Sequence, residues 1–274
     1  MTPAETYAQT RADAEALIRQ YAPARLQDAV IEKLLPAIAL SATRADDDAI
    51  VVGASKFGGA PDVPAGFEWP HWNEKPLGFM AQINLDEIAP FDIGSQLPSS
   101  GLLSFFYFMA DEDDWPWGEI EQAGGWRVFH FQQELHRAAV PPNSQGDVPL
   151  ATATLSPRAK WSVVGQPYYV TGEQMTDWPE EEVDNWFELR EEMKSDAPQL
   201  MLGYPNDIQD DARLEAATRL QRGDFNDWHL LLQLDTDDEI DWMWGDGGAI
   251  FYLIHRDDLA HRQWDKCWLI AQCC

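Results

Sequence analysis

Carboxylates gather beside tryptophans at two places in this sequence, and these residues are the best suited to chemistry. Residues 111–121 carry six acidic side chains and residues 235–246 carry six more, and neither stretch contains a lysine or an arginine. Aromatic rings bind cationic groups, and clustered carboxylates steer such groups toward a surface. We therefore predict a basic protein or peptide as the partner. It would be bound at Asp113, Asp114, Trp115, Trp117, Asp237, Asp238, Asp241, Trp242, Trp244 and Asp246.

The second acidic stretch also has the composition of a calcium-binding loop. Hard cations take clustered carboxylate oxygens. The available ones belong to Asp235, Asp237, Glu239, Asp241 and Asp246. The spacing departs from that of an EF-hand, whose loop needs glycine where this chain has Ile240. We expect no metal and no cofactor, and a cation-binding structural protein stays as an alternative.

No pattern of catalytic residues stands out. Asp237 and Asp238 are a candidate acid and base pair, but carboxylates at this density usually face water. The six histidines form neither an HxxxH nor an HExxH pattern, and no G-x-S-x-G turn occurs. Cys267, Cys273 and Cys274 have one basic neighbour, Lys266, to activate a thiol. No residue is assigned a catalytic role, and the alternative is an enzyme whose acids and histidines meet only in the fold.

The charge balance restricts the class of partner. The 274 residues include 19 basic and 47 acidic side chains, which give a formal net charge of −28. This charge opposes binding to nucleic acid or to anionic lipid, although it also suits a protein that only needs solubility. No stretch reaches the roughly 20 apolar residues that span a bilayer. Residues 1–21 lack the apolar core of a signal peptide, and the cysteine spacing predicts no disulfide framework. We expect a cytoplasmic protein, and its oligomeric state is left open.

Helices are predicted at three places. Residues 2–5 have the form of a capping box and begin a helical segment over residues 3–35, which Pro36 ends. Residues 180–194 predict an acidic helix, and residues 211–222 predict another that ends at Gly223. The apolar face expected for the acidic helix consists of Val183, Trp186, Phe187 and Met193.

Two parts of the chain echo each other, which predicts an internal duplication with repeat units at about 77–131 and 228–272. The first unit has predicted strands at Phe79–Asn84 and Leu102–Phe108, which correspond to predicted strands at Leu230–Asp235 and Ala249–Ile254 in the second unit. An acidic turn and a glycine lie between the two strands of each unit. A second alignment matches the two Asp-Trp-x-Trp-Gly turns instead, and chance similarity between short strands is a third explanation. The pattern favours an α+β fold of antiparallel β-sheets with the N-terminal helices packed on the sheet.

The segment between residues 56 and 72 predicts an ordered aromatic loop. Its glycines and prolines exclude a helix or a regular strand, and Phe67, Trp69 and Trp72 offer large apolar area to bury. A phosphate-binding loop has to open a helix, whereas prolines follow these glycines. Lys56 is the candidate functional residue of this loop, with a salt bridge to a nearby acid as its structural alternative.

Several motifs in order resemble one family over about Lys56 to Cys273. They read KFGGAPDVP, PLGFMAQINL, LP-x-x-G-LLSFFY, LGYPNDIQ, and LLLQLDTD with MWGDGGAIFYLI. They resemble the YwqG-like family, a bacterial domain of unknown function. This resemblance implies a single domain over residues 1–274 with antiparallel sheet and an internal duplication, and it supplies no catalytic residues. The lysine-glycine-glycine opening is more distantly similar to the programmed cell death protein 2 group, carriers of a ribosomal protein, whose zinc-binding cysteines this chain lacks.

Overall fold

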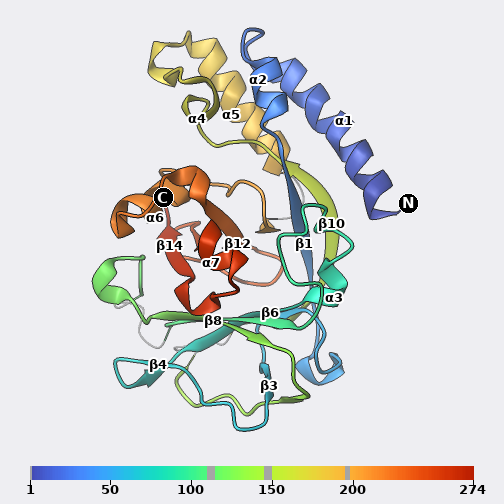
Figure 1. Cartoon of the computed structure of the whole chain (residues 1–274), viewed down its shortest axis with the longest axis vertical. Coiled ribbons are helices and arrows are strands. Elements are labelled where there is room, and N and C mark those ends of the chain that lie inside the picture. Colours follow the sequence, from blue (N-terminus) through green and yellow to red (C-terminus); the bar gives the residue numbers. More distant parts are fainter. Residues whose placement is uncertain (1, 110–114, 145–149, 195–197) are drawn as a thin grey trace.

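The protein is an α+β fold built around a ten-stranded antiparallel sheet (Figure 1). The computed structural model describes residues 2–109, 115–144, 150–194 and 198–274. In sheet order the strands are β14 (Trp268–Gln272), β13 (Ala249–His255), β12 (Trp228–Asp235), β11 (Gln199–Met201), β1 (Leu35–Arg44), β10 (Ala153–Ser162), β2 (Lys56–Phe57), β6 (Gly78–Asn84), β7 (Leu102–Tyr107) and β8 (Trp126–Phe131). The α+β antiparallel prediction is confirmed.

The sheet curves until its two ends pack face to face. The ring centroids of Phe105 on β7 and Tyr252 on β13 lie 5.1 Å apart, and the Tyr252 hydroxyl donates to the carbonyl of Phe106 over 3.1 Å. The Trp126 indole donates to the carbonyl of Cys267 over 2.9 Å. Alternate side chains of both ends meet in one apolar core, as period-two strands require.

The outer faces of the two ends have different covers. Helix α6 (Ala212–Leu220) packs its alanines against Phe251 and Leu253 of β13. The loop after β2 instead lays Phe67 and Trp69 on Phe106 of β7, at ring distances of 6.0 and 5.5 Å. This loop contains the short strands β3 (Asp62–Pro64), β4 (His71–Trp72) and β5 (Lys75–Pro76), and β3 pairs with β9 (Leu135–Arg137). The predicted packing of residues 56–72 against the body is confirmed. The exclusion of strands from this segment was wrong, because strands of two or three residues fit between the glycines, and Pro64 lies at a strand end.

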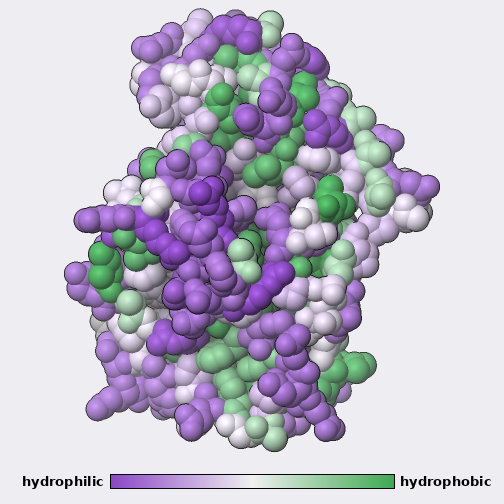
Figure 2. Space-filling view, in the orientation of Figure 1, coloured by the Kyte–Doolittle hydropathy of each residue, from purple (hydrophilic) through white to green (hydrophobic). Residues whose placement is uncertain are grey.

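A helical layer stands on the extended ends of β1 and β10, as a lobe above the curved sheet (Figures 1 and 2). It consists of α1 (Pro3–Tyr21), α2 (Gln27–Glu32), α4 (Tyr168–Thr171) and α5 (Glu180–Lys194). The predicted capping box is present, since the Thr2 side chain accepts from the amide of Glu5. The Trp161 indole of β10 donates to the carbonyl of Tyr7 and ties α1 to the sheet. None of the described helices has the length and hydropathy of a membrane span.

Some predicted boundaries were wrong for identifiable reasons. Pro36 lies inside β1 and not at the end of a helix, because the second helix already stops at Glu32. Phe187 is 48% exposed, whereas Leu189 of the same helix is fully buried. A short helix, α3 (Leu85–Ile88), follows β6 where the sequence predicted only an acidic turn, and a second short helix, α7 (Arg256–Ala260), follows β13.

The two ends of the sheet follow the same order and direction. Strands β2, β6, β7 and β8 run outward from the centre on one side, and β11, β12, β13 and β14 on the other. Both central hairpins carry an irregularity at the same place, between Phe79 and Ala81 in β6 and between Leu230 and Leu232 in β12. In register, Lys56 faces Gln82 and Leu200 faces Gln233.

Trp242 tests how far the core depends on the turn after β12. It is 1% exposed, its indole donates to the carbonyl of Ala151, and its ring lies 5.3 Å from Phe57. We expect Trp242→Ala to lower the free energy of unfolding by about 3–5 kcal/mol, as large-to-small core changes do. Urea unfolding measures this change.

The matched control is Trp117→Ala, whose ring is 38% exposed. We expect it to cost less than about 1 kcal/mol, as surface changes do. Equal losses in the two variants would contradict the assignment of Trp242 to the core.

Candidate functional site

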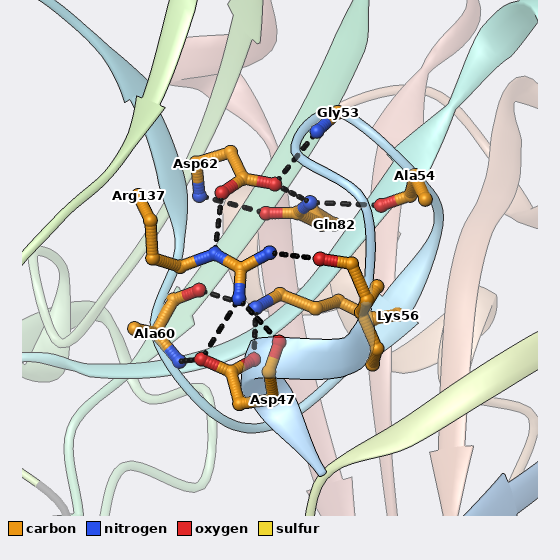
Figure 3. Close-up of polar contacts among 9 residues, drawn as sticks. Asp47, Gly53, Ala54, Lys56, Ala60, Asp62, Gln82 and Arg137 are labelled. Carbon is orange, nitrogen blue, oxygen red and sulfur yellow. Dashed lines mark hydrogen bonds and ion pairs between the residues drawn. The ribbon is translucent and has the colours of Figure 1, made fainter. Parts of the chain in front are cut away.

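Lys56 is the centre of a buried polar network between β2 and the loops around it (Figure 3). Its side chain is fully buried, and its ammonium group donates to the carboxylate of Asp47 and to the carbonyl of Ala60, each over 2.5 Å. Burial lowers the pKa of Lys56. Burial alone raises the pKa of Asp47, but hydrogen bonds from Lys56 and the Ala60 amide leave it below its usual value.

Arg137 and Gln82 join the same network to a second carboxylate, Asp62. The Arg137 guanidinium donates to Asp62 over 2.6 Å and also pairs with Asp47 over 3.0 Å. The Gln82 amide donates to Asp62 over 2.6 Å and accepts from the Asp62 amide over 2.8 Å. Asp62 is fully buried, whereas the Asp47 side chain is 24% exposed, so the guanidinium and the Gln82 amide mainly offset the cost of removing the Asp62 carboxylate from water.

The network also fixes the loop at residues 50–54. Arg137 donates to the carbonyl of Ile50, Gln82 to that of Ala54, and Gly53 donates its amide to Asp62. The buried polar groups therefore form hydrogen bonds with one another and with the main chain. This arrangement positions a loop, and the predicted salt bridge of Lys56 to a nearby acid is present.

A second buried carboxylate, Asp207, lies beside α6. It accepts from the amide of Ala212, and its neighbours are the buried ion pair of Asp211 with Arg213. Burial raises the pKa of Asp207 to about 8, and Asp211 adds to the rise. The adjoining crevice, lined by Arg190 and Asn206 among others, has a volume of about 10 Å³. A space of this size holds about one water molecule, which is too small for a substrate.

The two tryptophan-bearing stretches meet in space. The ring centroids of Trp115 and Trp244 lie 6.1 Å apart, and the amide of Ala271 on β14 donates to the carbonyl of Trp117. Trp117 is 38% exposed, but Trp242 and Trp244 are 1% and 4% exposed. The expectation that all four rings line a surface is therefore corrected for these two, because the curved sheet encloses them in its core.

The predicted carboxylates differ in what they can offer to a partner. Asp238 and Asp246 are exposed, whereas Asp237 is partly buried and accepts from Gln199. Asp241 is exposed and forms an ion pair with Arg44. Asp113 and Asp114 lie outside the described residues. Within the described part of the chain, no group of three or more histidine, cysteine, aspartate or glutamate side chains is placed to hold a metal ion.

Sequence reasoning found Lys56 but missed the partners that define its site. Asp47 and Arg137 come from segments 90 residues apart, and no spacing rule links them. Asp207 was equally hidden, because its raised pKa depends on burial by α6. The only signal in the sequence was the abundance of Asp, Gly and Pro in these loops. It predicted turns, but it did not predict which side chains form the ion pairs.

Fold and site together define an α+β domain in which buried charges hold loops and acidic side chains of two turns reach the surface. The sequence profile of a domain of unknown function, DUF1963, matches residues 55–273. The chain belongs to this family. The match leaves out β1, although that strand lies at the centre of the sheet. No curated protein matches the chain.

A double-mutant cycle on Lys56 and Asp47 tests the network. Removing one partner of a buried ion pair strands the other charge, so we expect Lys56→Met to lower the free energy of unfolding by about 2–4 kcal/mol. Asp47→Asn should then cost less in the Lys56→Met background than alone, with a coupling of about 1–3 kcal/mol. Chemical unfolding of the four proteins measures it. Lys266→Met, at a half-exposed lysine, is the control, and additive losses would show that the pair is not coupled.

The buried carboxylates predict a pH dependence of stability. Burial raises the pKa of Asp235 to about 6, and that of Asp207 is about 8. A carboxyl with a raised pKa in the folded state stabilises the fold fully below its unfolded pKa of about 4, and this stability is lost as pH rises through the folded pKa. We expect the melting temperature to fall between about pH 4 and about pH 8.

The variant Asp207→Asn isolates one carboxyl from the general repulsion of a protein with a net charge of −28. It keeps an oxygen for the Ala212 amide but cannot ionise. Between about pH 4 and about pH 8 the unfolded carboxyl is ionised and the folded one is protonated, so we expect the melting temperature of the variant to fall less than that of the wild type in this range, while the two change alike above about pH 8. If the melting temperatures of the two proteins change in parallel over the whole pH range, ionisation of Asp207 is not the cause of the pH dependence.

Proposed function

We propose that this protein is a non-catalytic module that binds a basic protein or peptide, in the manner of a chaperone or an inhibitor. The proposed surface, the acidic tryptophan face, is formed by Trp117, Glu119, Asp238, Asp241 and Asp246. Its partner would place cationic side chains among the carboxylates and aliphatic or aromatic atoms against Trp117. Lys56 would act on this module only through the loop that it holds.

One observation carries the proposal: the ring contact between Trp115 and Trp244 joins two acidic stretches that are far apart in sequence. We infer that the fields of the exposed carboxylates of both stretches add near this contact, where Asp241 pairs with Arg44 and Glu119 pairs with Arg219. Such fields raise association rates with cationic partners by roughly 10 to 1,000-fold and weaken within about 8 Å at physiological salt. The exposed ring of Trp117 lies at the same junction, where an aromatic side chain supplies contact area at low entropic cost.

We also propose that the domain is an internal duplication and that, within DUF1963, it is a YwqG-like single domain. Several matches between the two ends of the sheet support the duplication. Gly58 and Gly59 have φ of 58° and 70°, and Leu202 and Gly203 have φ of 59° and 70°. Gln82 accepts from the amide of Asp62, and Gln233 accepts from the amide of Asn206. A single duplication accounts for all the features that the two halves share: the strand order, the position of the bulges and the glutamine that binds main chain.

The three cysteines support a cytoplasmic setting for this module. Cys267, Cys273 and Cys274 are all free. Unpaired thiols persist where the compartment is reducing. We therefore expect basic partners to be sought among cytoplasmic proteins.

Affinity capture from a native lysate at low salt, compared between wild type and Trp117→Ala, tests the proposed function. We expect captured proteins to be more basic than the lysate and to be released by salt, because the attraction is screened. Loss of the exposed ring should weaken capture by about tenfold or more, which corresponds to about 1.4 kcal/mol.

Phe187→Ala is the matched control, since Phe187 is a 48% exposed aromatic on α5, away from the acidic tryptophan face. Circular dichroism verifies that each variant is folded. The proposal fails if captured proteins are no more basic than the lysate, resist salt, or bind Trp117→Ala as well as wild type.

A further inference from the structure

An open groove lies on the other half of the sheet, beside the loop that the Lys56 network holds. Its volume is about 370 Å³, and it is bordered by the start of β7, the end of β8 and the loop at Gly53. Ligand sites in proteins begin at about 300 Å³. The lining consists of Gly53, Asn84, Asp86, Ser100, Gly101, Leu102, Phe131, Gln132, Gln133 and Leu135.

The loop that borders this groove exposes apolar side chains without being free to move. Val51 and Val52 are 76% and 46% exposed, and both immediately precede Gly53. Their neighbours are clamped on each side, because Arg137 holds the Ile50 carbonyl, while Asn84 donates to the Gly53 carbonyl over 2.8 Å. Exposed apolar side chains on a fixed loop beside a groove are typical of an interaction site, since binding then costs little ordering.

The matching position on the other half of the sheet indicates what kind of molecule fits. Leu102 and Phe131 form the first pair of β7 and β8, as Ala249 and Gln272 do in β13 and β14. There the buried Gln272 amide accepts from the main-chain amides of Ile208 and Gln209 and donates to the carbonyl of Asp210. The C-terminal half thus fills this position with main chain of its own, the bend at residues 208–210, held by a glutamine amide.

The groove has the chemistry to take main chain in the same way. The hydroxyl of Ser100 and the amides of Gln132 and Gln133 include both donors and acceptors, which match peptide groups. Asn84 serves the wall of the groove instead, since its amide holds the Gly53 carbonyl and its oxygen accepts from the Asp86 amide. Among the described residues, the lining contains Asp86 and no lysine or arginine. Glu87 and Glu134 are exposed next to lining residues, so the rim carries negative charge.

We propose that this groove binds a peptide segment of a partner, with a small apolar side chain against Val51 and Val52 and a basic residue near Asp86. Glutamine side chains hold the main chain of the peptide, and the rim carboxylates select a lysine or arginine. The loop of the Lys56 network is the rigid wall of the site. The groove uses other residues than the acidic tryptophan face, so either site can exist without the other.

Selection from a phage-displayed library of random 12-residue peptides tests this site on the whole protein at physiological salt. We expect enriched sequences to combine lysine or arginine with valine-like residues. Synthetic copies should bind wild type at least tenfold more tightly than they bind Gln132→Arg, which places a cation in the groove. The double variant V51D/V52D should lose binding to a similar extent, and its side chains are too exposed to support the fold.

Phe187→Asp and Trp117→Ala are the controls, and we expect both to bind the selected peptides as wild type does. Hydrogen exchange should slow at residues 51–53 and 132–135 when peptide is added. Absence of enrichment, or equal binding to Gln132→Arg, overturns the groove site. Loss of binding with Trp117→Ala alone would also overturn it, while supporting the acidic tryptophan face.

Discussion

Irregular backbone is hard to bury, because each amide and carbonyl that leaves water needs a partner. This protein meets that constraint with four glutamines that are at most 1% exposed: Gln82, Gln199, Gln233 and Gln272. Each carboxamide binds main-chain groups of a neighbouring segment, donating through its nitrogen and accepting through its oxygen. Without these clamps, the loops that cover both ends of the curved sheet would leave unpaired polar groups in a dry interior.

The two halves meet the same constraint with different residues. Around Gln82 the clamp is extended by charges, since Lys56, Asp47, Asp62 and Arg137 surround it. Around Gln233 the matching register position belongs to Leu200, and the clamped amide belongs to Asn206. Buried ion pairs add little net stability over apolar substitutes, but they tolerate few alternative geometries. In the half that contains Lys56, the buried charges therefore fix the position of one loop.

That loop and the acidic turns give the protein its two candidate surfaces. On one side the curvature of the sheet buries Trp242 and Trp244 and leaves Trp117 at the junction of two acidic stretches. On the other side the corresponding position stays open as a groove. A rigid frame with polar, acidic rims suits recognition of a cationic, partly apolar segment, because the frame loses little freedom on binding.

The sequence by itself determined the local elements. The capping box at Thr2, the acidic helix over Glu180–Lys194 and the strands of both central hairpins follow from spacing and side-chain type, which are properties of neighbouring residues. It also determined the overall charge, on which our proposal of a basic partner rests. These features depend on interactions a few residues apart, which a pattern can record.

Only the tertiary structure decided which of those residues are available. Trp242 and Trp117 have the same surroundings in sequence, yet one is core and the other surface, because burial depends on how the sheet closes. Lys56 meets Asp47 and Arg137, and Asp207 acquires its raised pKa, through contacts between distant segments. The groove beside Gly53 is likewise a product of packing, since its walls come from four separate stretches of chain. Long-range contacts of this kind leave no periodic trace in the sequence.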